Sequence, residues 1–322
     1  MLQVRAQFTS LYTNILIISP GLDLVANICS ASLTGCKPKS TVVEFAPGSI
    51  VTPGHYTADP GTAGSTTLLL QVSYPTLLFS SSSEPSSLTL RGGTNASQAP
   101  QIDYTQQILL PFLRTHLGLS PQLTIRTRGY FPRGGGEVQL SIPPIRGPLP
   151  AVSLTERGAV KVISGRAYVA GLPARLAREI RDAAVSTLVS AGIDPEIIDI
   201  AAVRENDTEV VGKGSGIVLW AETENGCRLG GSSTGMRGDD LAGLGRSAAE
   251  ELARNITHGG CVDEYLQVRY LYSTLDSYSR EAQDQIIIFL ALAKGKSTVR
   301  TGPLTLHTKY VQILHTAMQA TY

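Results

Sequence analysis

Between about residue 40 and residue 150, short runs of β-branched and apolar residues alternate with clusters of Gly, Pro, Ser and Asn. Runs of this length between turn formers are typical of β-strands. The predicted strands are residues 41–45, 67–73, 76–79, 87–90, 123–126 and 137–142. This part of the chain is therefore predicted to build mainly sheet.

One helix is predicted among these strands, over residues 102–116. Ile108, Leu109, Phe112 and Leu113 can share one face of it, and a kink is expected at Pro111 because proline lacks the backbone N–H.

Residues 158–238 read as a compact unit of their own, with predicted strands at 160–170, 197–203, 217–222 and 227–231 and a helix at 174–190. Pro173 suits the first helical turn, and Gly192 follows the helix end. Apolar residues recur every four positions: Leu176, Ile180, Ala184 and Leu188. We predict a small inserted α/β domain here.

A further helix is predicted over residues 239–256, where acidic residues can cap its start and His258-Gly259-Gly260 follows its end. Beyond it the pattern returns to that of the first part. We therefore expect a main domain of residues 21–157 and 239–322.

Composition narrows the classes of protein. With 42% hydrophobic and 16% charged residues, the 322-residue chain can bury a sizeable core. The formal net charge of +1 excludes a broad basic surface that tracks along nucleic acid, so any RNA contact should be local.

Neither cysteine spacing nor hydropathy points to a special compartment. The four cysteines form no C-x-x-C pair, so we expect neither a zinc site nor a disulfide framework. We expect the protein to reside in a reducing compartment. The apolar patch at residues 15–18 is cut short by Pro20 and Gly21, so we expect no membrane segment and no signal peptide.

The segment at residues 126–137 combines three arginines with a glycine run. One interpretation is phosphate binding by backbone N–H groups and arginine side chains. The other is a hairpin loop whose glycines serve the turn and whose arginines are solvated. The residues alone favour neither interpretation.

His307 follows a Gly-Pro turn inside a short β-prone run. Taken alone, such a histidine is more often structural than nucleophilic, and the loop histidines His55 and His258 read the same way. Asp284-Gln285 precedes the apolar run 286–293, which we expect to be a buried helix or strand capped by these polar residues. No His, Asp or Glu spacing is typical of a zinc site.

Five motifs occur together in one order. They are Ala99-Pro100-Gln101-Ile102-Asp103-Tyr104, the glycine loop 128–137, Thr155-Glu156-Arg157-Gly158, residues 258–267 (His258-Gly259-Gly260 through Gln267) and residues 301–308. In order and spacing the chain resembles the RNA 3′-terminal phosphate cyclase family over about residues 21–267 and 284–308. The resemblance implies an α+β fold of repeated units, each a four-stranded sheet with two helices, plus a small inserted α/β domain.

The resemblance also implies an ATP-dependent ligase-type reaction. His307 would attack the α-phosphorus of ATP to form a histidine–AMP intermediate, for which a largely neutral imidazole is suited. AMP would pass to the RNA 3′-phosphate, and the neighbouring 2′-hydroxyl would then displace it to give a 2′,3′-cyclic phosphate. Proximity makes that last step effectively unimolecular.

By the same resemblance, five residues correspond to positions that contact the nucleotide: Gln71, Pro100, Tyr265, Asp284 and Gln285. Mg²⁺ or a similar divalent metal is expected to neutralise the triphosphate, with ligands not identified. Arg128 and Arg133 are expected to contact RNA phosphate. The family's eukaryotic members suggest a nuclear location.

The chain departs from the family pattern in two places. Residues 1–20 do not match, and the family's Glu-Gly-Gly-Gly-Gln-x-x-Arg-type segment is not found, so part of the first repeat is expected to be missing and a sheet edge exposed. Residues 268–283 separate Tyr265 from Asp284-Gln285. We interpret them as retained intron sequence, because Val268-Arg269 can be encoded by GTACGT and Gln283 by CAG.

Alternatives to an active enzyme stay open. The family's non-catalytic branch acts in ribosome biogenesis and lacks the nucleophilic histidine, whereas His307 is present here. The chain as given could be an inactive form, because of its start and its insertion. A fold relative such as an enolpyruvyl transferase would explain neither the His307 segment nor the inserted domain.

Overall fold

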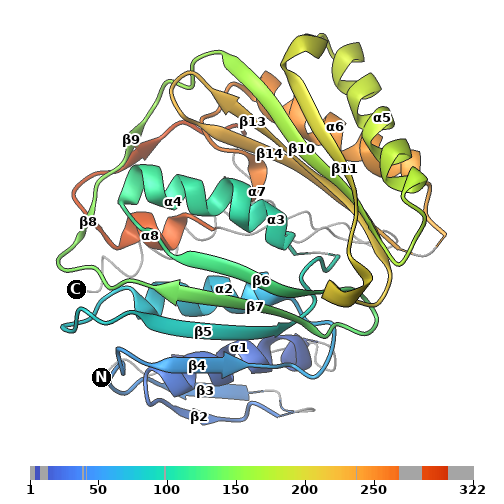
Figure 1. Cartoon of the computed structure of the whole chain (residues 1–322). Helices are drawn as coiled ribbons and strands as arrows, with labels where there is room; N and C mark the ends of the chain where they lie inside the picture. The colour runs from blue at the N-terminus through green and yellow to red at the C-terminus, as the bar shows by residue number, and fades with distance from the viewer. Residues whose placement is uncertain are drawn as a thin grey trace. The chain divides into compact units, whose positions relative to one another are not determined.

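The computed structural model describes residues 4–7, 14–37, 40, 42–97, 99–236, 238–267 and 285–303. Helices and strands are mixed in it, which confirms the predicted α+β class (Figure 1). The chain divides into two compact units, the first made of residues 1–94 and 119–148 and the second of residues 95–118 and 149–322.

The first unit holds two groups of strands. β1 (Val4–Gln7), β3 (Val42–Ala46) and β2 (Ser32–Thr34) pair antiparallel in the order β1-β3-β2. The other strands of the unit run in the order β6-β7-β5-β4. Their bounds are β4 His55–Ala58, β5 Ser86–Gly92, β6 Gln122–Gly129 and β7 Gly136–Ile142. β4 and β5 are parallel, and the other neighbours are antiparallel.

Two predicted strands of this unit are wrong. Residues 67–73 form helix α2 (Thr66–Ser73), which packs on β5 and on helix α1 (Asn14–Ile28). The N–H of Leu68 donates to the Ser65 hydroxyl, which caps the helix. Its buried positions, which include Thr66, Leu69, Leu70 and Ser73, recur with the helical spacing of three and four residues, a signal that the leucine run obscured.

Residues 76–79 are predicted as a strand, but Thr76 and Leu77 belong to the 3₁₀ helix η1 (Tyr74–Leu77). Pro75 occupies its first turn, where a missing N–H costs nothing. Only Phe79 takes part in a bridge, with Ile145.

The second unit is built around a sheet of order β11-β10-β13-β14. Its strands are β10 Val160–Ala170, β11 Ile198–Arg204, β13 Gly214–Thr223 and β14 Arg228–Gly235, close to the predicted ones. Short elements lie between β11 and β13 and before β11: η3 Pro195–Ile197, η4 Asp207–Glu209 and β12 Val210–Val211. β10 and β11 are parallel and the other neighbours antiparallel, the same alternation of directions as along β4-β5-β7-β6.

One face of this sheet carries helices α5 (Arg175–Ser190) and α6 (Leu241–His258), which pack against each other. Apolar side chains from both helices and from the strands form the core between them, among them Ile163, Ile180, Leu219 and Leu252. The predicted insert ends at residue 238, before α6, whereas α6 packs on the same sheet as α5. The boundary at residue 238 therefore stays a prediction.

The opposite face of the sheet is covered by residues 102–117, where α3 (Ile102–Tyr104), a π-helical turn (Thr105–Leu109) and α4 (Leu110–Leu117) follow one another. The predicted helix is thus confirmed. The π-helical turn lies just before Pro111, whose nitrogen has no hydrogen to donate to a carbonyl of the preceding turn. Arg228 of β14 donates to the Gln107 carbonyl at 2.6 Å, and a side chain on Gly230 would meet Tyr104 and Ile108.

Short parallel pairs join distant segments of the second unit. β15 (Ala293–Lys294) pairs with β8 (Leu149–Pro150), and β16 (Thr298–Val299) pairs with β9 (Ser153–Leu154). Helices α7 (Glu264–Gln267) and α8 (Ile287–Ala291) complete the unit. No helix in the described ranges is long and apolar enough to cross a bilayer.

Candidate nucleotide site

The glycine pair after α6 lies beside the start of the predicted His307 motif. The Cys261 N–H donates to the Arg300 carbonyl at 2.8 Å, and Val262 forms a parallel bridge with Thr301. A side chain on Gly260 would lie 2.6 Å from the Gly302 nitrogen, so only glycine permits this approach. Residues 258–263 and 300–303 therefore run side by side, whereas His307 itself lies outside the described residues.

The Thr155–Gly158 motif joins the same region. The Arg157 guanidinium donates to the Ile256 carbonyl at the end of α6, at 2.7 Å. The Arg300 N–H donates to the Leu154 carbonyl at 2.8 Å. These contacts hold residues 154–157, which lead into β10, against the end of α6 and against Arg300.

Two segments that carry predicted nucleotide contacts are joined through a tyrosine. Pro100 is buried just before α3, and Tyr265 lies in α7. The Tyr104 hydroxyl at the end of α3 donates to Asp263 Oδ1, immediately before α7, at 2.7 Å. The structure thus brings the Pro100 and Tyr265 segments together, and of Tyr265 it describes only the backbone.

A buried polar cluster anchors the Pro100 segment to the sheet. Gln101 donates to the carbonyls of Ile217 and Ser233, at 3.1 Å each. The Asn95 amide donates to Gln101 and Tyr168 at 3.1 and 3.0 Å. The Tyr168 hydroxyl donates to Gln101 at 2.8 Å. Each of these side chains is at most 6% exposed.

A charged group extends this cluster. The Arg166 guanidinium lies 2.7 Å from Glu205 and 3.9 Å from Asp103, and stacks 5.6 Å from the Tyr168 ring centre. Sequence reasoning did not single out Asn95, Arg166 or Tyr168. No local pattern reveals them, because their partners are up to 73 residues away along the chain.

Gln285, the second predicted polar residue before the apolar run, is 2% exposed. Its amide nitrogen Nε2 is buried without a hydrogen-bond partner among the described residues. A buried amide of this kind costs free energy unless something accepts from it, and a nucleotide acceptor would suffice. Asp284 lies outside the described residues.

The remaining predicted site residues belong to the first unit. Gln71 is half-buried on α2. The glycine loop closes the antiparallel pair β6–β7, with Gly134 and Gly135 at φ of 64° and 70° and a bridge between Tyr130 and Gly134. The loop is therefore a hairpin turn in which the glycines serve the turn, and phosphate binding by this loop stays a prediction. Arg133 is exposed and Arg128 half-buried, and their contact with RNA phosphate stays a prediction.

No cluster of three or more His, Cys, Asp or Glu side chains suited to a metal ion occurs within the described ranges. We therefore assign no ligand to the expected Mg²⁺. All four cysteines carry free thiols. Burial, and then the neighbouring Cys227, raise the pKa of the Cys261 thiol to about 11, so this thiol is protonated and weakly nucleophilic at neutral pH.

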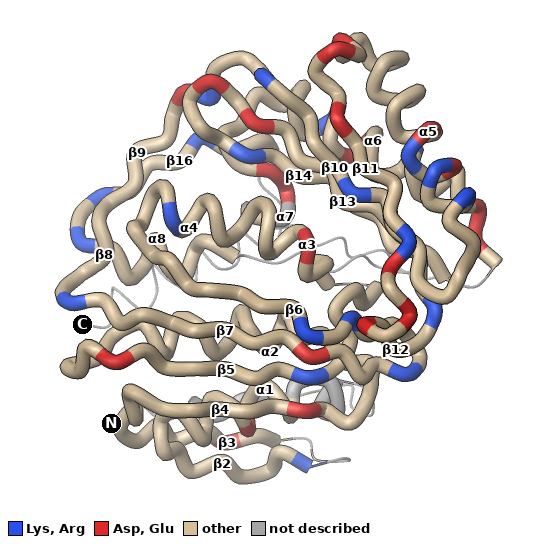
Figure 2. The backbone as a smooth tube through the Cα atoms, in the orientation of Figure 1, with Lys and Arg blue, Asp and Glu red and all other residues tan. Residues whose placement is uncertain are grey.

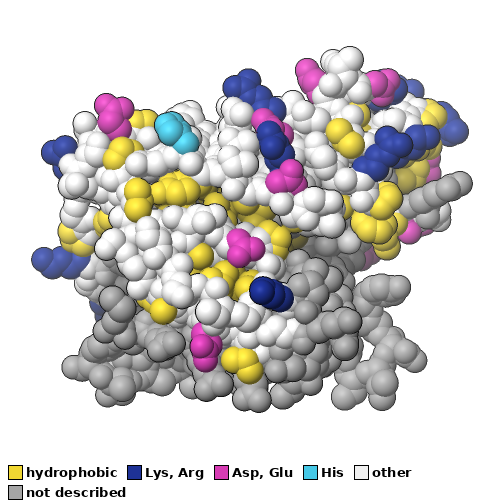
Figure 3. Space-filling model, turned by 90° about the horizontal axis from the view of Figure 1, so that it is seen from below, with side chains coloured by type: hydrophobic (Ala, Val, Ile, Leu, Met, Phe, Trp, Pro, Cys, Tyr) yellow, Lys and Arg dark blue, Asp and Glu magenta, His cyan; other side chains and the backbone are white. Residues whose placement is uncertain are grey.

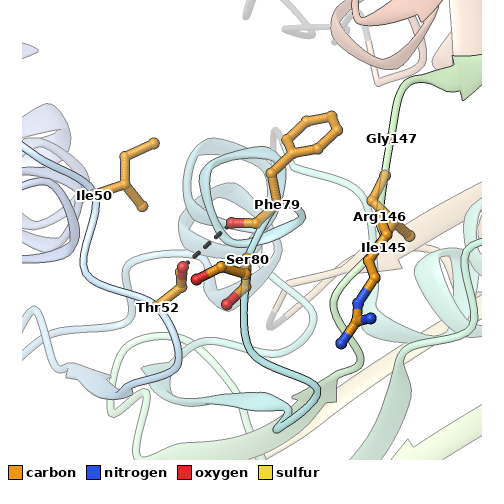
Figure 4. A pocket seen from close by; sticks show the side chains of 8 residues that line it. Ile50, Thr52, Phe79, Ser80, Ile145, Arg146 and Gly147 are labelled. Carbon is orange, nitrogen blue, oxygen red and sulfur yellow. Dashed lines mark hydrogen bonds between the residues drawn. The ribbon is translucent and has the colours of Figure 1, made fainter.

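A shallow groove of about 420 Å³ lies in the first unit and is lined by Phe79, Ile145 and neighbouring residues. Phe79 and Arg146 stand on either side of it, and Thr52 donates to the Phe79 carbonyl (Figure 4). None of the predicted site residues lines it, so we assign it no part in the reaction.

Charge is spread rather than gathered. Lys and Arg are interspersed with Asp and Glu along the tube in Figure 2, and in Figure 3 the basic side chains toward the upper edge have acidic ones beside them. This distribution fits the net charge of +1 and a local contact with RNA.

The fold and the converging motifs define an α+β protein in which the Pro100, Tyr265 and Thr301 segments meet through buried hydrogen bonds. The sequence profile of the RNA 3′-terminal phosphate cyclase family matches residues 19–321, so the chain belongs to that family.

Curated relatives agree with this assignment. The chain is similar to a probable RNA 3′-terminal phosphate cyclase of Dictyostelium discoideum, with 33% identity over 90% of this chain and 63% of the relative. It is 34% identical to the RNA 3′-terminal phosphate cyclase of Drosophila melanogaster, over 90% of this chain and 74% of the relative. It is 35% identical to the RNA 3′-terminal phosphate cyclase of Caldivirga maquilingensis, over 88% of this chain and 74% of the relative. The chain thus spans less than two thirds of the Dictyostelium protein.

Proposed function

We propose that this protein converts an RNA 3′-terminal phosphate to a 2′,3′-cyclic phosphate at the expense of ATP. His307 attacks the α-phosphorus and displaces pyrophosphate, AMP passes to the RNA phosphate, and the adjacent 2′-hydroxyl displaces AMP. The expected Mg²⁺ and a nuclear location belong to the same proposal.

The observation that supports this most is the meeting of three motif segments in the second unit. Tyr104 and Asp263 join the segments that carry Pro100 and Tyr265, and the Cys261–Arg300 hydrogen bond places the start of the His307 motif alongside. Buried Gln285 offers an unsatisfied amide donor in the same unit. In the first unit we assign Gln71 to the nucleotide, and Arg128 and Arg133 to RNA phosphate.

Covalent labelling tests the first step. The purified chain is incubated with α-³²P-labelled ATP and Mg²⁺, and acid-stable and acid-labile label are separated, because a phosphoramidate is lost in acid. We expect an acid-labile label that His307→Ala abolishes. His55→Ala is the matched control, because His55 is exposed and lies on β4, and it should keep the label.

The second step is read from an oligoribonucleotide with a 3′-phosphate, whose end becomes resistant to phosphatase on cyclisation. A folded chain that takes up no label and closes no RNA end contradicts an active enzyme. A variant without residues 268–283 is assayed in parallel: label in that variant alone would assign the failure to the insertion rather than to the site.

A further inference from the structure

Asp263 is a buried carboxylate that three elements share. It is 1% exposed and directly precedes α7. Its Oδ1 accepts from the Tyr104 hydroxyl at 2.7 Å and from the Leu266 N–H at 2.9 Å, while Oδ2 accepts from the Gly230 N–H at 2.5 Å. Helices α3 and α7 and strand β14 are thereby held at one point.

Both carboxylate oxygens are needed for this arrangement. Hydrogen bonds to an ionised acceptor are shorter and about twice as strong as neutral ones. An amide in the same place would keep one acceptor oxygen and turn an N–H₂ group toward a donor. The close fit extends to Gly230, where a side chain would lie 2.6 Å from the Tyr104 ring and 3.0 Å from Asp263 Oδ2.

Asp263 is linked to both segments that carry predicted nucleotide contacts, the Pro100 segment and the Tyr265 segment. Gln101, next to Pro100, is bound to the sheet, and Tyr104, one helical turn on, is bound to Asp263. The Leu266 N–H donates to the same carboxylate and sets the first turn of α7, the helix of Tyr265. The segments of Pro100 and Tyr265 are therefore both held by the carboxylate of Asp263.

We infer that Asp263, acting through Tyr104, is a positioning residue that fixes the Pro100 and Tyr265 segments as two walls of one ATP site. The inference rests on the proposed function only in that ATP is the ligand. Asp263 itself is not assigned any contact with ATP.

Tyr104→Phe is the decisive variant, because it removes one hydroxyl and leaves the buried ring in place. Loss of a hydrogen bond to a charged acceptor predicts an affinity for ATP about tenfold weaker. Equilibrium binding of ATP by calorimetry measures this without requiring chemistry. Asp263→Asn should have a larger effect, and Asp199→Asn, on an exposed position of β11, is the matched carboxylate control.

A merely structural role would give a different result. If Asp263 acts by positioning, the variants should have a raised KM for ATP. Their labelling rate at saturating ATP and their KM for RNA should stay near those of the parent chain. A damaged fold would instead lower the fraction of active protein, and so the activity with both substrates.

Unchanged ATP affinity in Tyr104→Phe, or no ATP binding by the parent chain, overturns the inference. ATP binding without covalent label overturns the proposed function alone. The comparison of ATP affinity between Tyr104→Phe and the parent chain would then still decide the role of Asp263.

Discussion

Glu251 is a fully buried carboxyl group in α6 that accepts from the Ser232 N–H at 3.1 Å. Burial, followed by the negative charges of Glu264 and Asp263, raises the pKa of Glu251 to about 8, although the Ser232 N–H and Arg254 act in the opposite direction. The group is therefore largely protonated at pH 7, and the folded state holds a proton that the unfolded chain releases.

Because its folded pKa lies above the unfolded value, Glu251 contributes full stability below about pH 4.5, and this contribution falls as the pH rises to about 8. We expect the free energy of unfolding to drop over that range by on the order of 3 kcal/mol from this group. Glu251→Gln should remove the slope.

Urea unfolding at pH 5.5, 7 and 8.5 measures the effect, with Glu250→Gln on the exposed side of the same helix as the control. A stability gap between Glu251→Gln and the parent chain that does not widen with pH would contradict a raised pKa.

At the scale of elements, the crossing of α5 and α6 depends on Gly245. A methyl group there would lie 2.1 Å from the Ile180 carbonyl oxygen and 3.0 Å from the Ala184 nitrogen, both backbone atoms that cannot turn away. Gly245→Ala should therefore force the helices apart and lower the free energy of unfolding by about 2 kcal/mol or more.

Gly243→Ala, two residues earlier in the same helix, is the control. There the nearest atom is the far end of the Asp240 side chain, at 3.0 Å, and alanine gains about 0.5–1 kcal/mol of helix propensity. Thermal unfolding should separate the two variants in opposite directions, and equal melting temperatures would show that the crossing has room to relax.

At the scale of the whole molecule, 27 basic and 26 acidic residues limit what electrostatics contributes to RNA binding. With contacts to about two phosphates of a single strand, raising salt from 50 to 200 mM should weaken binding about tenfold or less. Fluorescence anisotropy of a 3′-phosphorylated oligoribonucleotide measures this slope. A loss of about a thousandfold would indicate an extended basic interface instead.

By itself the sequence determined the class of fold and most of the second unit. The helix at α5 and the strands β10, β11 and β13 follow from periodicity and terminal residues, since Ile180, Ala184 and Leu188 are buried as their spacing predicts. The five ordered motifs also pointed to the family that the profile match assigns. Local patterns suffice for such features because they depend on neighbours in the chain.

Tertiary structure decided the rest. Helix α2 was mistaken for a strand because its leucines alone do not reveal which side is covered, and packing on α1 and β5 sets that. The roles of Asn95, Tyr104 and Asp263 depend on partners as far as 159 residues away, for example Tyr104 and Asp263. Sequence could name Pro100 and Tyr265, but only the folded chain shows that one buried carboxylate ties their segments together, because hydrogen bonds join residues in space regardless of their distance along the chain.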